Sequence, residues 1–374
     1  MNKRTILSLA TVLLSSITNT ARADYALNLK APATEIAGQI YDLHTLILWV
    51  CAAIFVVVFG VMFYSIYKHR KSVGHKAAQF HEHHILEVVW TIIPALILIV
   101  MAYPATKTIL AMKDTAAADM SIKATGHQWK WEYEYMDQGV RFISTLATPQ
   151  DQIDGKAEKG EHYLLEVDNP IAVPIGKKVR VLLTASDVIH SWWLPEFGIK
   201  QDAIPGFIKE VWFRVDKPGT YRGQCAELCG KNHGFMPIVV EAMEESKYNE
   251  WITSKKEAAT TATAAAVAGA AKEWTKDDLI ANGKAVYDKN CAVCHQANGQ
   301  GLPPAFPALT GGKITTGPIE GHLEIVLKGG KTVMPKWGPM LNDVEIASVI
   351  TYERNALGNS VGDMLQPAQV KAAR

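Results

Sequence analysis

A segment of twelve residues near the middle of the chain concentrates metal ligands. Cys225, Cys229, His233 and Met236 supply two thiols, an imidazole and a thioether, which are soft ligands of the kind that copper prefers. His190, further upstream, adds a second imidazole. A blue-copper site uses only one cysteine, so the additional thiol predicts two thiolates that bridge a pair of copper ions.

Two other interpretations of this segment explain fewer of its residues. A disulfide between Cys225 and Cys229 suits an exported chain, but it gives His233 and Met236 no role. A zinc site of two cysteines and two histidines leaves Met236 unused. The residue types therefore favour copper over both alternatives.

A second site for chemistry lies near the C-terminus. Cys291-Ala-Val-Cys294-His295 has the spacing of a c-type haem attachment site, in which both thiols bind the haem covalently and the histidine ligates the iron. A methionine on the opposite side of the haem would raise its reduction potential. Met334 is the favoured ligand, and Met340 and Met364 are alternatives. We expect His322 to lie on a helix surface, with a bis-histidine haem as a minor alternative.

The N-terminal part of the chain has the pattern of an exported membrane protein. A charged start, a short apolar run and Ala21-Arg22-Ala23 predict a signal peptide over residues 1–23. Apolar segments then predict membrane helices over about 43–67 and 85–110, each long enough to span a bilayer. The loop between them is basic, so it should stay cytoplasmic and leave the rest of the chain on the outer face.

The remaining chain predicts two soluble domains and a linker. The 374 residues have a net charge of +1, which gives no indication of a nucleic-acid partner. Residues 113–252 predict a β-sandwich or barrel. The Ala/Thr-rich residues 253–272 predict a linker, with transient helix as an alternative. Residues 273–374 predict a small all-α domain. The expected strands are Ile122–Tyr135, Tyr163–Val167, Val179–Ala185, Ile208–Val215 and Ile238–Glu241, and the expected helices run from Thr275 to Asn290, from Ile319 to Lys328 and from Asp343 to Asn355.

These features together resemble subunit II of the haem-copper cytochrome c oxidases over residues 40–250. The resemblance rests on the two-helix hairpin, the copper segment and the motifs Trp90-Thr-Ile-Ile-Pro94, Gly126-His-Gln-Trp-Lys-Trp-Glu-Tyr133 and Asp202-Ala-Ile-Pro-Gly206. Residues 274–357 resemble a class I cytochrome c, including its Met-Pro segment at Met334-Pro335. The resemblance implies a membrane hairpin, a cupredoxin-like domain and a fused cytochrome c domain.

The resemblance also assigns roles to individual residues. Cys225 and Cys229 would bridge the binuclear copper centre, CuA, while His190, His233, Met236 and the backbone carbonyl of Glu227 would complete its ligands. The Glu227 carboxylate would reach a magnesium or manganese ion shared with subunit I.

Two further roles follow from the same resemblance. Trp129 matches the aromatic residue that passes electrons to CuA, although its place in the alternating aromatic run Trp129, Trp131, Tyr133 and Tyr135 also suits packing on a strand face. Lys130 departs from the mitochondrial pattern, which has an aromatic residue there. Glu87 matches a carboxylate at the entrance of a proton channel; a charge at a helix end can equally reach the headgroups.

The implied function is electron transfer into a proton-pumping oxidase of the bacterial inner membrane. Electrons would pass from an external cytochrome c or other small redox protein through haem c and CuA to subunit I, with subunit III as a further partner. Oxygen would be reduced on subunit I, so no catalytic residue is expected on this chain. The alternatives are a CuA subunit of a nitric oxide or nitrous oxide reductase and a non-catalytic copper carrier.

Overall fold

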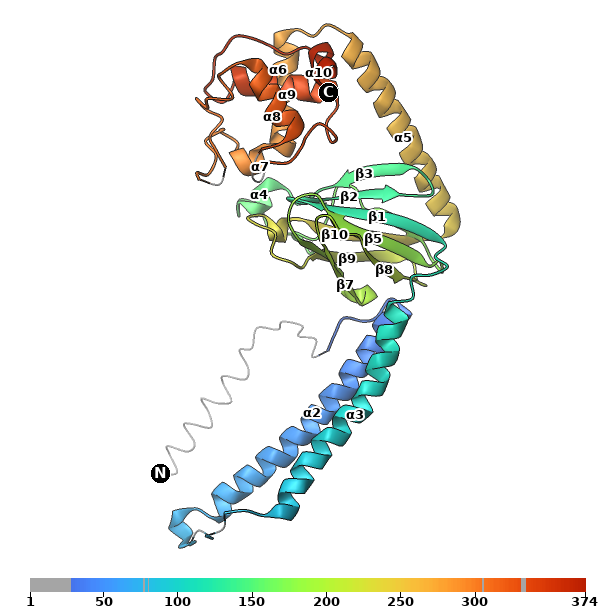
Figure 1. The fold of residues 1–374 in the computed structure, drawn as a ribbon, viewed down its shortest axis with the longest axis vertical. Coiled ribbons are helices and arrows are strands. Elements are labelled where there is room, and N and C mark those ends of the chain that lie inside the picture. The colour runs from blue at the N-terminus through green and yellow to red at the C-terminus, as the bar shows by residue number, and fades with distance from the viewer. Residues whose placement is uncertain (1–27, 77, 80, 305, 331–333) are drawn as a thin grey trace. The chain divides into compact units, whose positions relative to one another are not determined.

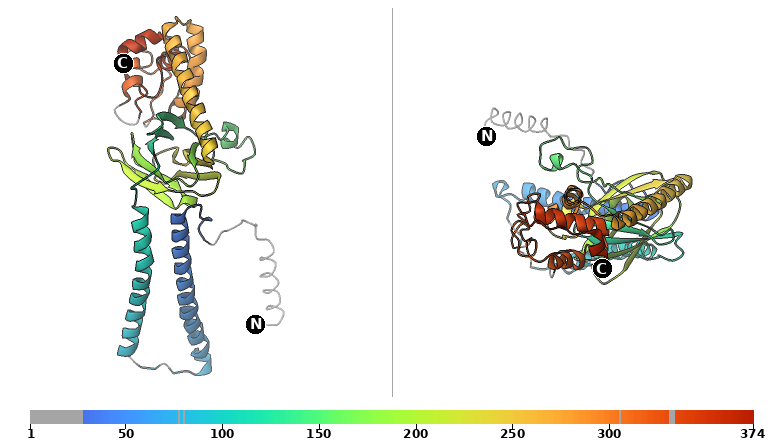
Figure 2. Two further views of the ribbon diagram at one scale, coloured as in Figure 1. Left: turned by 90° about the vertical axis from the view of Figure 1, so that its right-hand side faces the viewer. Right: turned by 90° about the horizontal axis from the view of Figure 1, so that it is seen from above.

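The first compact unit of the protein is built on two long helices. The computed structural model describes residues 28–374 except 77, 80, 305 and 331–333. Helices α2 (Glu35–Lys68) and α3 (His84–Met112) run antiparallel, and the short 3-10 helix η1 (Lys71–Val73) follows α2 (Figures 1 and 2). The signal peptide predicted over residues 1–23 lies outside the described residues.

Both helices are long and apolar enough to cross a membrane, as the sequence predicts. α2 begins earlier than expected because Thr34 caps it: the Thr34 hydroxyl accepts a hydrogen bond from the Ala37 amide at 3.1 Å and donates one to the Phe197 carbonyl at 2.9 Å. With 34 residues, α2 is about 51 Å long at about 1.5 Å per residue. It therefore exceeds the hydrocarbon core of a bilayer, which is about 30 Å thick.

The second compact unit begins with a sandwich of two five-stranded sheets. The first sheet has the order β3-β2-β1-β5-β8, and the second has the order β4-β10-β9-β6-β7. Buried aromatic side chains such as Trp131, Trp192 and Phe213 fill its core. The strands are β1 (Met120–His127), β2 (Lys130–Tyr135), β3 (Val140–Ser144), β4 (Ile171–Pro174), β5 (Val179–Ala185), β6 (His190–Leu194), β7 (Ile199–Ala203), β8 (Lys209–Phe213), β9 (Gly219–Cys225) and β10 (Pro237–Met243).

The sandwich confirms the predicted class but corrects two predicted strands. The run Ile122–Tyr135 is an antiparallel hairpin, β1 and β2, because the chain reverses at Gln128 and Trp129. Tyr163–Val167 is not a strand: it contains a turn, and Val167 forms only an isolated bridge with Leu146. Short elements complete this region, namely α4 (Gln150–Ile153), η2 (Pro195–Phe197) and η3 (His233–Phe235).

The segment predicted as an Ala/Thr-rich linker is helical. α5 (Glu245–Ala271) continues from the end of the β-sandwich through most of residues 253–272 (Figure 1). Alanine has the highest intrinsic helix propensity, so this composition extends a helix whose first turns bury Tyr248 and Ile252. The sequence shows no apolar face here, which is why periodicity alone did not predict the helix.

The C-terminal helices match their predicted ranges closely. α6 (Lys276–Asn290) is capped by Thr275, and α9 (Asp343–Asn355) by a capping box of Asn342 and Glu345. The sequence did not predict the short helix α10. A core that includes Leu279, Tyr287 and Ile350 joins these helices. The other helices are α7 (Ala292–His295), α8 (Ile319–Lys328) and α10 (Pro367–Ala373).

Candidate copper and haem centres

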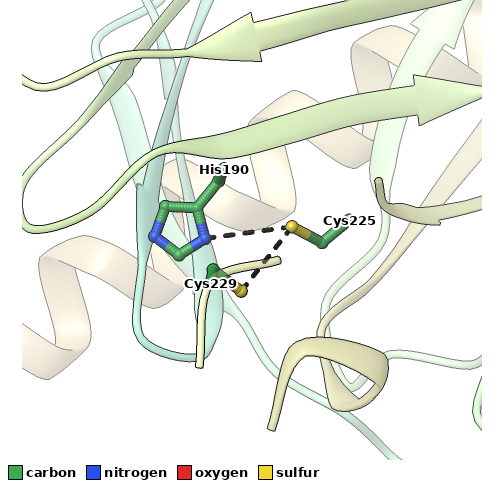
Figure 3. A group of neighbouring side chains, drawn as sticks. All are labelled: His190, Cys225 and Cys229. Atoms are coloured by element: carbon green, nitrogen blue, oxygen red, sulfur yellow. Dashed lines mark hydrogen bonds between the residues drawn. The ribbon is translucent and has the colours of Figure 1, made fainter. Parts of the chain in front are cut away.

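All six groups that the sequence predicts as copper ligands lie together at one end of the β-sandwich. The Cys225 sulfur lies 3.8 Å from the Cys229 sulfur and 3.9 Å from Nδ1 of His190. Figure 3 shows these three side chains pointing toward one another. The remaining groups surround the sulfurs: the Glu227 carbonyl lies 3.4 Å from the Cys225 sulfur, and Nδ1 of His233 and the Met236 sulfur each lie 3.6 Å from the Cys229 sulfur.

Neighbouring strands bring the distant ligands together. His190 is the first residue of β6, and Cys225 is the last residue of β9, which pairs with β6 so that Trp192 lies opposite Cys225. The chain then loops through Cys229 and His233 and enters β10 just after Met236. The Cys225 amide donates to the Met236 carbonyl at 3.4 Å, which closes the loop at its base.

A glycine provides the room for His190. A Cβ atom on Gly126 would lie 2.7 Å from Cδ2 of His190, closer than any unstrained contact. The imidazole therefore packs directly on the backbone of β1, which only glycine allows.

The β1–β2 hairpin also fixes the segment from Cys225 to Met236, called the copper loop below, through hydrogen bonds. The indole of Trp129 and the side-chain amide of Gln128 donate to the Cys229 carbonyl at 3.1 and 2.8 Å. The indole of Trp131 donates to the Met236 carbonyl at 3.3 Å. Two ligand residues are thus held by their backbone carbonyls, which leaves their sulfurs free to bind metal.

The electrostatics of the cluster favour a thiolate. A hydrogen bond from the Cys229 thiol lowers the pKa of Cys225 well below its ordinary value, and the same contact raises the pKa of Cys229. Burial alone would lower the pKa of His190, but its hydrogen bond to Asp187 raises it. Copper binds cysteine as the thiolate, so the lowered pKa of Cys225 favours metal binding at this cluster.

Asp187 is a site residue that the sequence interpretation missed. Its Oδ1 atom lies 2.8 Å from Nε2 of His190, and the amide of Gln128 donates to Oδ2 at 2.8 Å. A metal-binding histidine usually donates its second N–H to a carboxylate or carbonyl. An acid three residues before His190 was the available signal. Asp187 leaves Nδ1 of His190, the atom that faces the Cys225 sulfur, free to bind copper.

The haem attachment motif lies at a cavity of about 410 Å³ in the C-terminal helical region, within the range of about 300–1,000 Å³ typical of ligand pockets. Cys291, Cys294, His295 and Met334 all line it. Nδ1 of His295 lies 2.9 Å from the Pro307 carbonyl, which leaves Nε2 free for iron. The residues present therefore fit a covalently bound haem.

Of the three methionines considered, only Met334 lines this cavity. The Gly330 amide donates to the Met334 carbonyl at 3.0 Å. Gly329 has φ +80°, and a Cβ atom on it would lie 2.7 Å from the same carbonyl oxygen. Met340 packs against the same helical core as Met334 but does not line the cavity, and Met364 is 41% exposed.

The sequence interpretation placed His322 on a helix surface, but the structure buries it. Only 2% of it is exposed, and it lines the haem cavity together with Glu353. α8 turns it inward because His322 shares a helix face with the buried Leu323 and Val326. Periodicity alone does not decide whether a histidine on such a face is buried.

The predicted aromatic run contains both packing residues and a residue at the copper loop. Trp131, Tyr133 and Tyr135 are fully buried, which confirms their packing role.

The Trp129 ring contacts the Phe306 ring edge-on, with centroids 6.4 Å apart, and Phe306 lines the haem cavity. The neighbouring Lys130 ammonium lies 4.3 Å from the centre of the Trp337 ring, which also borders that cavity. Burial lowers the pKa of Lys130 to about 8.

The two predicted carboxylates have accessible side chains. Glu227 is exposed at the copper loop. Glu87 lies in the first turn of α3, where its Oε1 atom accepts a hydrogen bond from the His83 amide at 3.1 Å. Its side chain remains 42% exposed.

Comparison with protein families assigns each region. Residues 22–108 match the transmembrane domain of cytochrome c oxidase subunit II, and residues 120–243 match its periplasmic domain. Residues 278–352 match the family of subunit III of cbb3-type cytochrome c oxidases, a cytochrome c domain. The family matches therefore cover the membrane helices, the copper-binding sandwich and the haem-binding helices separately.

Individual relatives agree with the family matches. The probable cytochrome c oxidase subunit 2 of Rickettsia bellii is 36% identical over 63% of this chain and 86% of its own length. Cytochrome c oxidase subunit 2 of Cereibacter sphaeroides is 36% identical over 59% of this chain and 77% of its own length. The crystal structure of the periplasmic domain of subunit II of Bradyrhizobium japonicum cytochrome oxidase is 44% identical, covering 38% of this chain and 97% of that one, with a TM-score of 0.35. The chain belongs to the cytochrome c oxidase subunit II family, a component of a terminal oxidase complex, and carries a cytochrome c domain in addition.

Proposed function

We propose that this chain delivers electrons to a proton-pumping cytochrome c oxidase of the bacterial inner membrane. An external donor, a cytochrome c or another small redox protein, would reduce haem c, and the electron would continue through CuA to haem in subunit I, where oxygen is reduced to water. The observation that carries the proposal is the convergence of six copper-ligand groups from His190 and the β9–β10 loop.

The copper cluster would hold its metal in a fixed geometry. Cys225 and Cys229 would bridge two copper ions, with His190 and His233 as imidazole ligands and Met236 and the Glu227 carbonyl as weaker ones. Bound in this way, the metal pair would accept and release one electron shared between two ions. The chain's own contribution is rigidity, because strand pairing and the bonds from Gln128 and Trp129 hold the loop before and after transfer.

The haem would be held by Cys291 and Cys294 through thioether bonds, with His295 and Met334 as iron ligands. When bound, it would supply a one-electron redox group. Two details support this ligand set: the Pro307 carbonyl fixes the orientation of His295, and Gly329 allows the close turn that presents Met334.

Trp129 would carry the electron between the two centres. Its ring contacts Phe306 of the haem cavity, and its indole nitrogen donates to the backbone of Cys229, one of the bridging cysteines. Trp129 itself is only 9% exposed, so most of its ring lies away from solvent. Lys130 supports the same arrangement by placing its charge over Trp337, a cation–π contact that desolvation strengthens.

The membrane region would bind subunits I and III. The described part of α2 and α3 exposes many large apolar side chains along its length, as expected of helices that contact lipid and other membrane subunits. Glu87, exposed at the start of α3, would admit protons to a channel of subunit I. Glu227, exposed beside the copper ligands, would bind a magnesium or manganese ion at the boundary with that subunit.

One preparation tests the redox centres. The solubilised complex should show c-type haem absorption bands and an electron paramagnetic resonance spectrum split by two equivalent copper nuclei. Cys225→Ser should abolish the copper signal while the haem bands remain, and Cys51→Ser, which changes an exposed cysteine of α2, should alter neither. A single-copper hyperfine pattern in the copper-loaded wild type would refute the binuclear assignment.

A further inference from the structure

The wall of the haem cavity contains a buried acid–base pair. Nε2 of His322, on α8, lies 2.8 Å from Oε2 of Glu353, on α9. His322 is 2% exposed and Glu353 is 4% exposed, and both line the cavity. Neither residue has a part in attaching the haem or ligating its iron in the function proposed above.

The two side chains contact each other and also border the haem cavity. Nδ1 of His322 is buried and has no hydrogen-bond partner in the described part of the chain. Glu353 also contacts Cys291: burial raises the pKa of that thiol well above its ordinary value, and the Glu353 carboxylate raises it further. The carboxylate therefore lies beside one of the two haem attachment points.

Helix packing alone does not account for this pair. α8 and α9 already contribute Leu323, Val326 and Ile350 to a common apolar core. Burying an acid and a base is costly, and apolar residues of similar volume often serve stability as well or better. A buried carboxylate at a redox cofactor has a different consequence, because charges interact strongly where water is excluded.

The guanidinium of the neighbouring Arg354 is bonded to groups other than this carboxylate. Arg354, the next residue on α9, directs its guanidinium to Asp363 at 2.6 Å and to the carbonyls of Thr315 and Gly317 at 2.8 and 2.9 Å. Burial raises the pKa of Tyr287, on α6, and of Tyr352, on α9, and the nearby Glu353 carboxylate raises both further. Among the described residues, His322 is thus the basic side chain in direct contact with the Glu353 carboxylate.

We propose that the His322–Glu353 pair sets the reduction potential of the covalent haem. The proposal rests on haem occupying this cavity. The Glu353 carboxylate favours the oxidised haem, which carries one more positive charge, and so lowers the potential. His322 is a positioning residue: its imidazole holds the carboxylate in place and moderates its field. Burial and charge near the haem are established determinants of haem potential.

Redox titration of the purified complex, followed at the c-type absorption band, tests the proposal. Glu353→Gln keeps the shape and can still pair with His322 but removes the charge, so the haem c potential should rise. His322→Gln replaces the imidazole with an amide, which cannot be protonated and therefore compensates the carboxylate less, so the potential should fall. Glu320→Gln removes the same charge from an exposed position on α8, where water screens it, and should leave the potential unchanged.

The controls separate this inference from the proposed function. The methionine–iron charge-transfer band should persist in all three variants, which shows that the axial ligands are unchanged. If Glu353→Gln fails to retain haem, His322→Gln decides the question by itself. Wild-type potentials in the variants that retain haem would overturn the inference and leave the electron-transfer function intact. Absence of covalent haem from the wild type would instead overturn the proposed function.

Discussion

The indole nitrogen of Trp129 donates a hydrogen bond to the carbonyl oxygen of Cys229 at 3.1 Å. One side chain therefore both contacts the haem-cavity residue Phe306 and binds the backbone of a copper-loop cysteine. The sequence left electron transfer and packing as equal alternatives for Trp129. In the structure the residue is buried and contacts residues of both candidate centres, while its role in electron transfer stays a prediction.

Trp129→Phe should slow electron transfer from haem to copper several-fold or more. The substitution removes the indole donor but leaves the carbonyl of Cys229 bonded to the Gln128 side chain at 2.8 Å, so the copper spectrum should not change. Flash-induced electron transfer within the complex measures the rate. Trp251→Phe, in the aromatic cluster of Tyr135 and Phe142, is the matched control. A wild-type rate in Trp129→Phe would exclude this residue from the route.

Asp187→Asn should weaken copper binding by about 10–100-fold, the usual effect of removing a carboxylate that orients a metal-binding histidine. Asparagine can still accept the hydrogen bond from His190 but does not supply the charge. Chelator titration followed by copper absorbance measures the change in affinity. The control is Asp216→Asn, which changes a side chain that is 63% exposed beside Arg214. Its copper affinity should equal that of the wild type. Equal affinities in the two variants would show that the Asp187 charge is dispensable.

Met334→Ala should abolish the methionine–iron charge-transfer band and lower the haem potential, because a thioether ligand favours reduced iron. Met340→Ala should preserve both, since Met340 packs against the core outside the cavity lining. Absorption spectra of the oxidised complex distinguish the two variants. Loss of the band only in Met340→Ala would assign the ligand to Met340.

Glu132 should stabilise the β-sandwich in a pH-dependent manner. Burial by itself would raise its pKa, but hydrogen bonds from His127 and Arg141 outweigh that effect and lower the pKa to about 2. Against an unfolded value of about 4.3, this shift corresponds to roughly 3 kcal/mol at neutral pH. Because the folded pKa is depressed, the contribution is complete above the unfolded pKa and disappears as the pH falls toward 2.

Urea unfolding of the copper-free chain, followed by tryptophan fluorescence, tests this dependence. Six of the ten tryptophans lie between residues 129 and 251, so the signal reports mainly on the sandwich. Glu132→Gln should be less stable than wild type at pH 7, and the difference should narrow between about pH 4 and pH 2. Glu134→Gln removes an ion pair with Lys123 that is half exposed, so it should lower the free energy of unfolding only slightly. A pH-independent difference would contradict the ionic explanation.

The sequence was sufficient for features that local chemistry specifies. Cap residues and apolar periodicity predict the bounds of α6 and α9, and periodicity alone predicts those of α8. Ligand type and spacing predict residues that the structure brings together at the two candidate centres. The sequence was insufficient for features that depend on contacts between residues far apart in the chain. The hairpin turn at Gln128 and Trp129 lies within a continuous β-rich run, and the pairing of His322 joins it to Glu353, thirty-one residues away. Asp187 carries no motif of its own, and only strand geometry shows that it binds His190.

Gly126 contributes nothing that could ligate a metal, yet the imidazole of His190 occupies the space where its Cβ would be. A methyl group at position 126 would displace a copper ligand without altering any residue of the binding motif. A screen for copper-deficient variants should therefore recover substitutions at this position, and inspection of the ligand motif alone would leave them unexplained.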